Sequence, residues 1–244
     1  MTGTGTAAAP GRQAPAMIHS HQDINGGWLR PAVFGAMDGL VSNFALIAGV
    51  AGGSVSPGTI TITGLAGLAG GAFSMAAGEY TSVASQSDLA RREVEIERRS
   101  LRRSPDAERR ELADLYISRG LDENLAMQVA TQLSRDPDVA LATHAREELG
   151  VDPDDLPSPW TAAASSFVAF SVGALLPLLP YLLGATALWP ALILTAIGLF
   201  TAGAAVARVT ARPWWYSALR QLALGGAAGG VTYLLGMAIG TGLG

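Results

Sequence analysis

The sequence predicts an all-α membrane protein, with five transmembrane helices and a cytoplasmic helical domain between the second and the third. Two observations support this fold class. Five apolar segments reach the roughly 20 residues that a helix needs to cross the hydrocarbon core of a bilayer. The charges are concentrated between these segments: of the 20 acidic residues, 17 fall in residues 86–155, and so do 11 of the 16 basic residues.

The apolar segments are separated by short or polar links. The predicted spans are residues 31–53, 59–85, 161–183, 188–207 and 217–243. Pro177 and Pro180 lie inside the third span, where we expect them to kink or break the helix and free carbonyl groups near its outer end.

These spans divide the chain into four parts. Residues 1–27 are rich in Ala, Gly, Thr and Pro and predict a flexible tail, without the basic-then-apolar order of a signal peptide. Residues 28–85 hold spans one and two, residues 86–155 the polar domain, and residues 156–244 spans three to five.

Capping residues and glycines divide the polar domain into helices, and no strand pattern appears in it. We expect the second span to continue into this domain through residues 89–103. Later helices start where a capping residue stands alone or precedes a proline, and they end at glycine. The predicted starts and ends are Ser104-Pro105, Gly120, Asp122, Asp136-Pro137 and Gly150.

Arginine is distributed unequally between the two sides of the spans. The links 54–58 and 184–187 carry no charge. Arginines flank the other ends of the spans, within the polar domain and at Arg30, Arg208, Arg212 and Arg220. The positive-inside rule therefore places the N-terminus and the polar domain in the cytoplasm, and the C-terminus outside. An aromatic belt is expected on the same cytoplasmic side, at Trp28, Trp160, Trp214, Trp215 and Tyr216.

Composition excludes several classes of function. The chain has no cysteine, which excludes disulfides, thiolate metal sites and thiol catalysis. Its net charge of −4 gives no sign of nucleic-acid binding. A membrane enzyme is the least supported class, because no His-Glu-x-x-His or similar catalytic motif is present. We expect no bound cofactor.

Two acidic residues lie inside the predicted membrane spans. Asp38 and Glu79 are the only acidic residues in residues 31–85, which contain no basic residue. An unpaired carboxylate in hydrocarbon costs several kcal/mol and usually serves an ion or proton path. Both lie roughly 12–14 Å from the same face of the membrane, at ~1.5 Å of helix rise per residue, so one ion could touch both.

Met75 shares a helix face with Glu79, because the two are four residues apart. Two carboxylates and a thioether suit a divalent first-row metal such as Fe²⁺ or Mn²⁺. Burial favours the protonated acid, so metal entry would expel protons. Alternatively, the acids only bond to neighbouring helices, with Ser42 and Asn43 available as partners, and Met75 only fills space.

Acidic residues also recur at helical spacing in the polar domain. They include Glu97, Glu108, Glu111 and Glu148, with His144 one turn before the last. If their helices converge, these side chains would bind cations through carboxylate oxygens. Spacing alone favours solvated helix faces instead, because Arg98, Arg102, Arg109 and Arg110 stand beside Glu97 and Glu108.

Glycine pairs four residues apart occur in spans one and five. Small residues at this spacing let helix backbones approach closely. They indicate tight packing within the chain or, less often, a dimer seam. The pairs are Gly35/Gly39, Gly49/Gly53, Gly226/Gly230 and Gly236/Gly240.

Residues 19–244 resemble the vacuolar iron transporter family. The most specific stretches are Asp38-Gly39-Leu40-Val41-Ser42-Asn43 and Ser74-Met75-Ala76-Ala77-Gly78-Glu79-Tyr80-Thr81-Ser82; Pro105, Glu108, Glu111-Leu112 and Glu148-Leu149-Gly150 follow. The resemblance implies five spans, a homodimer and a cytoplasmic metal-binding domain. It also implies export of Fe²⁺, and often Mn²⁺, from the cytoplasm in exchange for protons.

By the same resemblance, Asp38, Met75 and Glu79 are pore residues, and the four glutamates of the polar domain are metal ligands. This chain departs from the family pattern at three positions. Ser100 stands where a second glutamate would follow Glu97, and His144 and Ala145 stand where a Met-Glu pair is expected. His144 can still bind metal, but we expect fewer or weaker sites in the domain.

The leading interpretation is a proton-coupled antiporter that exports Fe²⁺, Mn²⁺ or both, with divalent metal ions, protons and the lipid bilayer as its partners. The lysine-free, glycine-rich chain suggests a bacterial protein of the inner membrane. The alternative is a membrane-anchored metal sensor or buffer without transport, although such a protein has no use for acids inside the membrane.

Overall fold

The computed structural model describes residues 27–210 and 212–242. The predicted flexible tail, 1–27, lies outside the described residues except for its last glycine. Within the described part, every regular element is a helix and there is no strand, which confirms the predicted all-α class.

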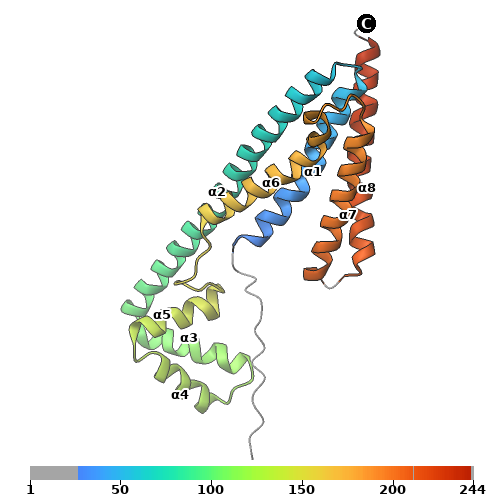
Figure 1. The fold of residues 1–244 in the computed structure, drawn as a ribbon. Coiled ribbons are helices and arrows are strands. Elements are labelled where there is room, and N and C mark those ends of the chain that lie inside the picture. The colour runs from blue at the N-terminus through green and yellow to red at the C-terminus, as the bar shows by residue number, and fades with distance from the viewer. Residues whose placement is uncertain (1–26, 211, 243–244) are drawn as a thin grey trace, which may run out of the picture.

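Five helices are long and apolar enough to cross a membrane, as the sequence predicts. They are α1 (Leu29–Gly52), α2 (Pro57–Arg103), α6 (Pro159–Leu182), α7 (Trp189–Thr210) and α8 (Trp214–Gly242). The α1–α2 link and the end of α8 lie at one end of this bundle, and the α7–α8 link lies at the other (Figure 1).

Helix α1 is central and packs against α2, α6, α7 and α8. Its glycines permit this packing. A Cβ on Gly39 would lie 2.3 Å from the carbonyl oxygen of Phe170 on α6, and a Cβ on Gly236 would lie 1.8 Å from the carbonyl oxygen of Gly49. Three of the four predicted glycine pairs therefore pack inside the chain, while Gly226 and Gly230 have no neighbour in reach of a Cβ.

The two prolines of the third span do not break it. Helix α6 runs through Pro177 and Pro180 and ends at Leu182. Tolerance of proline is usual in membrane helices, because neighbouring helices and side chains stabilise the backbone around it. In this chain the side chain of Asn43 donates a hydrogen bond to the carbonyl oxygen of Ala174, one turn before Pro177.

A group of short helices follows α2 and lies apart from the spans (Figure 1). It comprises α3 (Pro105–Ser118), α4 (Glu123–Leu133), α5 (Pro137–His144) and the π-helix η1 (Ala145–Leu149). We call these elements, together with the end of α2 that packs against them, the helical domain. Asp122 and Asp136 cap α4 and α5 as predicted, whereas Ser104 makes no side-chain cap before α3. Gly120 and Gly150 follow α3 and η1 with positive φ, the geometry that favours glycine.

Helix α2 joins the two regions without interruption. It has 47 residues, or about 70 Å at ~1.5 Å per residue, and ends at Arg103 as the sequence predicts. Where α2 leaves the spans, the Ser87 hydroxyl donates a 3.0 Å hydrogen bond to the carbonyl oxygen of Pro157, in the linker that enters α6. Because the helix is continuous, the helical domain is held at a fixed distance from the spans.

Candidate metal centres

The first candidate site is a cavity between the membrane helices. Asp38 from α1 and Met75 from α2 both line it, and its volume is about 270 Å³. The other lining residues come from α1, α2 and α6: Ser42, Asn43, Leu46, Gly67, Gly71, Ser74 and Phe170. Glycine at position 71 makes room for this arrangement, because a Cβ there would lie 2.2 Å from the Phe170 ring.

The polar neighbours of Asp38 are occupied with backbone groups. The Ser42 hydroxyl donates to the backbone carbonyl of Asp38 at 2.6 Å, and the Asn43 amide donates to Ala174. Among the described residues, no hydrogen bond to the Asp38 carboxylate is present. The bonds that would make this acid a purely structural residue are therefore not formed by Ser42 or Asn43.

Glu79 is placed differently from the prediction. Its side chain is buried, 8% exposed, and does not line the cavity that holds Asp38 and Met75. One of its carboxylate oxygens lies 3.7 Å from a guanidinium nitrogen of Arg30, whose side chain is 78% exposed. Glu79 thus has a basic partner at the start of α1, so the prediction of an acid without a basic neighbour is wrong for this residue.

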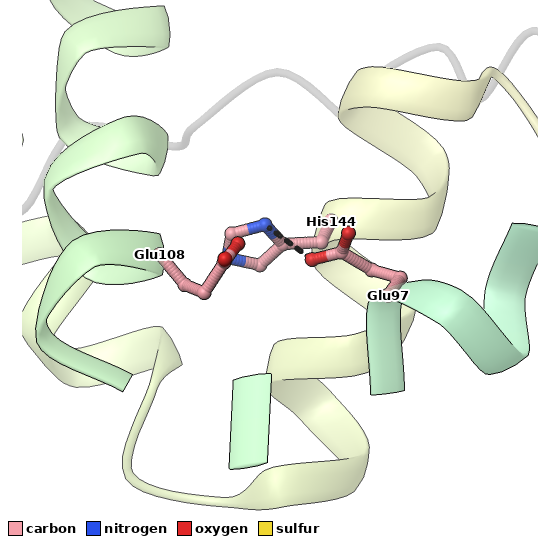
Figure 2. Close-up of side chains that lie close together, drawn as sticks. All are labelled: Glu97, Glu108 and His144. Atoms are coloured by element: carbon pink, nitrogen blue, oxygen red, sulfur yellow. Dashed lines mark ion pairs between the residues drawn. The ribbon is translucent and has the colours of Figure 1, made fainter. Parts of the chain in front are cut away.

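The second candidate site lies in the helical domain, where three helices converge. Glu97 from α2, Glu108 from α3 and His144 from α5 each present a ligand atom, and these atoms lie within 4.8 Å of one another. Figure 2 shows the imidazole ring between the two carboxyl groups. Ligands of one ion at about 2.0–2.2 Å from it lie ~4 Å or less apart, so a small approach of the side chains would let one ion bind all three.

His144 is completely buried and is the centre of this cluster. Its Nδ1 lies 2.7 Å from a carboxylate oxygen of Glu148 and 3.2 Å from one of Glu97. The Nε2 atom of His144 and the Oε1 atom of Glu97 are buried and have no hydrogen-bond partner among the described residues. A buried donor or acceptor without a hydrogen bond is costly, so His144 Nε2 is available to a ligand. Oε1 of Glu97 is the oxygen that lies 3.2 Å from Nδ1.

The serine at position 100 interacts directly with this cluster. Its hydroxyl donates a 2.5 Å hydrogen bond to Glu108 Oε1. At the position where the resemblance implies a glutamate, this chain therefore has a hydroxyl donor that stabilises the Glu108 carboxylate. Glu111 is exposed and lies at the edge of the cluster, where its charge raises the pKa values of Glu97 and Glu148.

Crowded carboxyl groups change the acidity of the cluster. Burial is the main cause that raises the pKa of Glu97 to about 7, and the nearby carboxylates of Glu148 and Glu108 add to the shift. Burial likewise raises the pKa of Glu148, although His144 acts in the opposite direction. At neutral pH, Glu97 therefore exchanges a proton readily, and a cation that bound there would displace it.

The neighbouring Glu147 does not join the cluster. It pairs with Arg119, and Tyr116 donates a hydrogen bond to it at 3.4 Å. Both Glu147 and Glu148 lie in η1, and π-helical turns occur often at functional sites. This turn directs one glutamate to α3 and the other to His144.

The structure thus groups most of the predicted ligands into two sites. Asp38 and Met75 share the membrane cavity, and Glu97, Glu108, His144 and Glu148 share the cluster; Glu79 and Glu111 lie outside both. The sequence interpretation missed Arg30 as the partner of Glu79, and it considered Asn43 only as a hydrogen-bond partner of the acids, whereas Asn43 bonds to Ala174. The proximity of Arg30, at the first turn of α1, to the returning helix could have indicated the pair.

Comparison with known proteins gives consistent results. The sequence model of the VIT family matches residues 29–237. The chain is 30% identical over 235 residues to Vacuolar iron transporter 1 of Oryza sativa subsp. japonica, covering 93% of each chain. It is 28% identical over 230 residues to Vacuolar iron transporter 1 of Arabidopsis thaliana, covering 93% of this chain and 92% of the relative. A Vacuolar iron transporter of Acanthamoeba castellanii is 43% identical over 153 residues, which are 63% of this chain and 55% of that protein.

Proposed function

The chain belongs to the VIT family, and we propose that it exports Fe²⁺, Mn²⁺ or both from the cytoplasm in exchange for protons. The relatives are named iron transporters, not enzymes, which supports metal transport across a membrane as the general activity. The choice of metal, the exchange for protons and the path are our proposal.

The observation that carries the proposal is the cavity shared by Asp38 and Met75. A carboxylate and a thioether from facing helices form a mixed oxygen and sulfur site. Oxygen ligands favour Mn²⁺ and Fe²⁺, and the softer sulfur disfavours Ca²⁺ and Mg²⁺. A carboxylate inside a span is costly, so its presence there supports a functional role such as transport.

Coupling to protons follows from the chemistry of carboxyl ligands. A carboxyl group must lose its proton before it binds metal, so metal binding releases protons. If Asp38 binds metal from one side and reprotonates from the other, each cycle exchanges metal for protons. Glu79, paired with Arg30 at the end of the spans nearer the helical domain, would pass ions between the two sites.

We propose that the cluster around His144 captures the metal first. Its ligand atoms come from three helices, and one of these helices, α2, continues into the membrane cavity. The helical domain would lie in the cytoplasm, and the protein would be a homodimer in a bacterial inner membrane. Arginine asymmetry supports the orientation, while the dimer rests on the family resemblance.

The decisive test is metal flux into proteoliposomes under a pH gradient. We expect the purified chain to move Mn²⁺ and Fe²⁺ when the gradient is present. Asp38→Asn is expected to abolish the flux without loss of folding, because the amide cannot exchange a proton. Met75→Leu retains volume and loses sulfur, and it is expected to weaken flux or change the preferred metal. Glu79→Gln is expected to abolish flux as well.

A membrane-anchored sensor or buffer is the competing function. It would bind metal at the cluster without any flux in either direction. If the parent chain binds Mn²⁺ but transports none under any gradient, the sensor is correct and the export proposal is wrong. If Asp38→Asn transports at the parent rate, Asp38 has no role in the path.

A further inference from the structure

Asn43 has a buried side-chain amide whose orientation is determined by its surroundings. The side chain is 2% exposed, and Nδ2 donates a 2.7 Å hydrogen bond to the carbonyl oxygen of Ala174 on α6. A backbone carbonyl only accepts, so the nitrogen of the amide must face Ala174. The amide oxygen, Oδ1, therefore points the other way.

That oxygen lies on the side of Asn43 that meets α2, and it is unsatisfied. Oδ1 is buried and has no hydrogen-bond partner among the described residues, and Asn43 lines the same cavity as Asp38 and Met75. The helix opposite has glycine at this point, because a Cβ on Gly67 would lie 2.6 Å from Oδ1. A buried acceptor without a partner is costly, so the oxygen indicates a ligand that the protein itself does not supply.

We propose that Asn43 Oδ1 is a further oxygen ligand for metal in the intramembrane cavity, in addition to the Asp38 carboxylate and the Met75 sulfur, which line the same cavity. This inference rests on the proposed function and adds the basis of its metal preference. An amide oxygen is a hard ligand that favours Mn²⁺ and Fe²⁺ over soft ions, and it brings no charge into the membrane. Asn43 would then balance the softness that Met75 brings to the site.

The alternative role for Asn43 is to fasten α1 to α6 through Ala174. The two roles differ in their effect on metal preference. Loss of a structural hydrogen bond between α1 and α6 lowers the affinity for every metal equally. Loss of an oxygen ligand lowers the affinity for Mn²⁺ more than the affinity for the softer Cd²⁺. Loss of the sulfur in Met75→Leu is expected to change the ratio in the opposite direction.

The test is equilibrium binding of Mn²⁺ and of Cd²⁺ to the purified full chain. All variants carry Glu97→Gln and Glu108→Gln, which remove two ligands of the cluster in the helical domain. Asn43→Leu is expected to lower Mn²⁺ affinity at least about tenfold relative to Cd²⁺, since even groups that only orient metal ligands are worth that much.

Gly67→Ala provides a second variant that leaves the bond between Asn43 and Ala174 in place. Its methyl group would crowd Oδ1 and is expected to lower Mn²⁺ affinity in the same direction, even if Asn43→Leu fails to fold. An unchanged ratio of Mn²⁺ to Cd²⁺ affinity in these variants would overturn the inference. Flux is measured separately, so a parent chain that binds metal with the expected ratios but transports none would refute the proposed function alone.

Discussion

At the residue scale, the cluster around His144 concentrates negative charge in a buried place. Glu97 has a pKa of about 7, against an ordinary value of 4.5, and burial is the main cause. The folded chain thus holds this proton more tightly than the unfolded chain does. By linkage, the stability from this group is fully present below pH 4.5 and is lost as the pH rises through about 7.

This loss of stability with rising pH leads to a prediction for Glu97→Gln. In metal-free protein, the melting temperature of the parent chain is expected to fall as the pH is raised from about 5 to about 8. The glutamine variant carries no charge at either pH, so its melting temperature should fall less and should exceed that of the parent at the upper pH. Thermal denaturation across this pH range measures both.

Glu95→Gln is the matched control, because Glu95 lies on the same helix with its side chain half exposed and pairs with Arg98. Its pH profile is expected to follow the parent. If the melting temperatures of the parent and of Glu97→Gln changed in parallel with pH, the pKa of Glu97 would not be raised by folding.

Sequence could identify the chemistry of single residues but not their partners. Glu97, Glu108 and His144 were predicted as ligands from the family resemblance, whereas spacing alone favoured solvated helix faces, and the structure brings the three together. The pairing of Arg30 with Glu79 was missed, because it joins the start of one helix to a distant turn of another. Such contacts depend on how each helix is rotated about its axis and how far it is shifted along it. The hydrophobic periodicity of the sequence does not determine either to within the length of a side chain.

At the element scale, local signals predicted the helices well. Capping residues followed by proline mark helix starts, and glycines mark helix ends. Both signals act on the local backbone, so they can be read from neighbouring residues in the sequence. The partners of the glycine pairs were not predictable in this way. A small residue permits close approach to any helix, and only the structure shows that Gly39 faces α6 and that Gly49 faces α8.

Close packing of α1 against α6 can be tested at Gly39. In Gly39→Ala the new Cβ would lie 2.3 Å from a backbone oxygen, which cannot move without shifting the helix. Overpacking of this kind costs about 1–3 kcal/mol, and we expect a lower melting temperature in detergent. Gly78→Ala is the control, because nothing lies within 4 Å of a Cβ there. An unchanged melting temperature in Gly39→Ala would contradict the close contact of these helices.

The convergence of α2, α3 and α5, which brings acidic side chains together, can also be tested. Clustered carboxylates repel by roughly 1 kcal/mol per close pair in a water-like dielectric. A bound divalent ion removes this repulsion, so Mn²⁺ is expected to raise the melting temperature of the parent chain by linkage. The double variant Glu108→Ala/Glu111→Ala should bind fewer ions and gain less. Equal binding and equal stabilisation in both proteins would leave these helices as a solvated scaffold.

At the scale of the whole molecule, the separation of charge from apolar surface determines how the chain can sit in a bilayer. The described helices leave large apolar side chains exposed along α2, α6, α7 and α8, as a lipid-facing surface requires. Trp28, Trp160 and Trp214, which stand at the starts of α1, α6 and α8, are all more than half exposed. Exposed tryptophans at helix starts suit the headgroup region of a membrane.

Orientation in the membrane is the property on which the direction of transport depends. The Arg-rich helical domain and the α7–α8 link are expected in the cytoplasm, and the uncharged α1–α2 link outside.

Because the chain has no cysteine, single-cysteine variants need no prior removal of native thiols. In intact cells, an impermeant thiol reagent should label Ser56→Cys and should fail to label Asp114→Cys until the membrane is opened. Ser56 caps α2 in that link, and Asp114 lies on α3, so the two sites report opposite faces. External labelling of Asp114→Cys in intact cells would show that the orientation is the opposite one. The same metal path would then serve uptake instead of export.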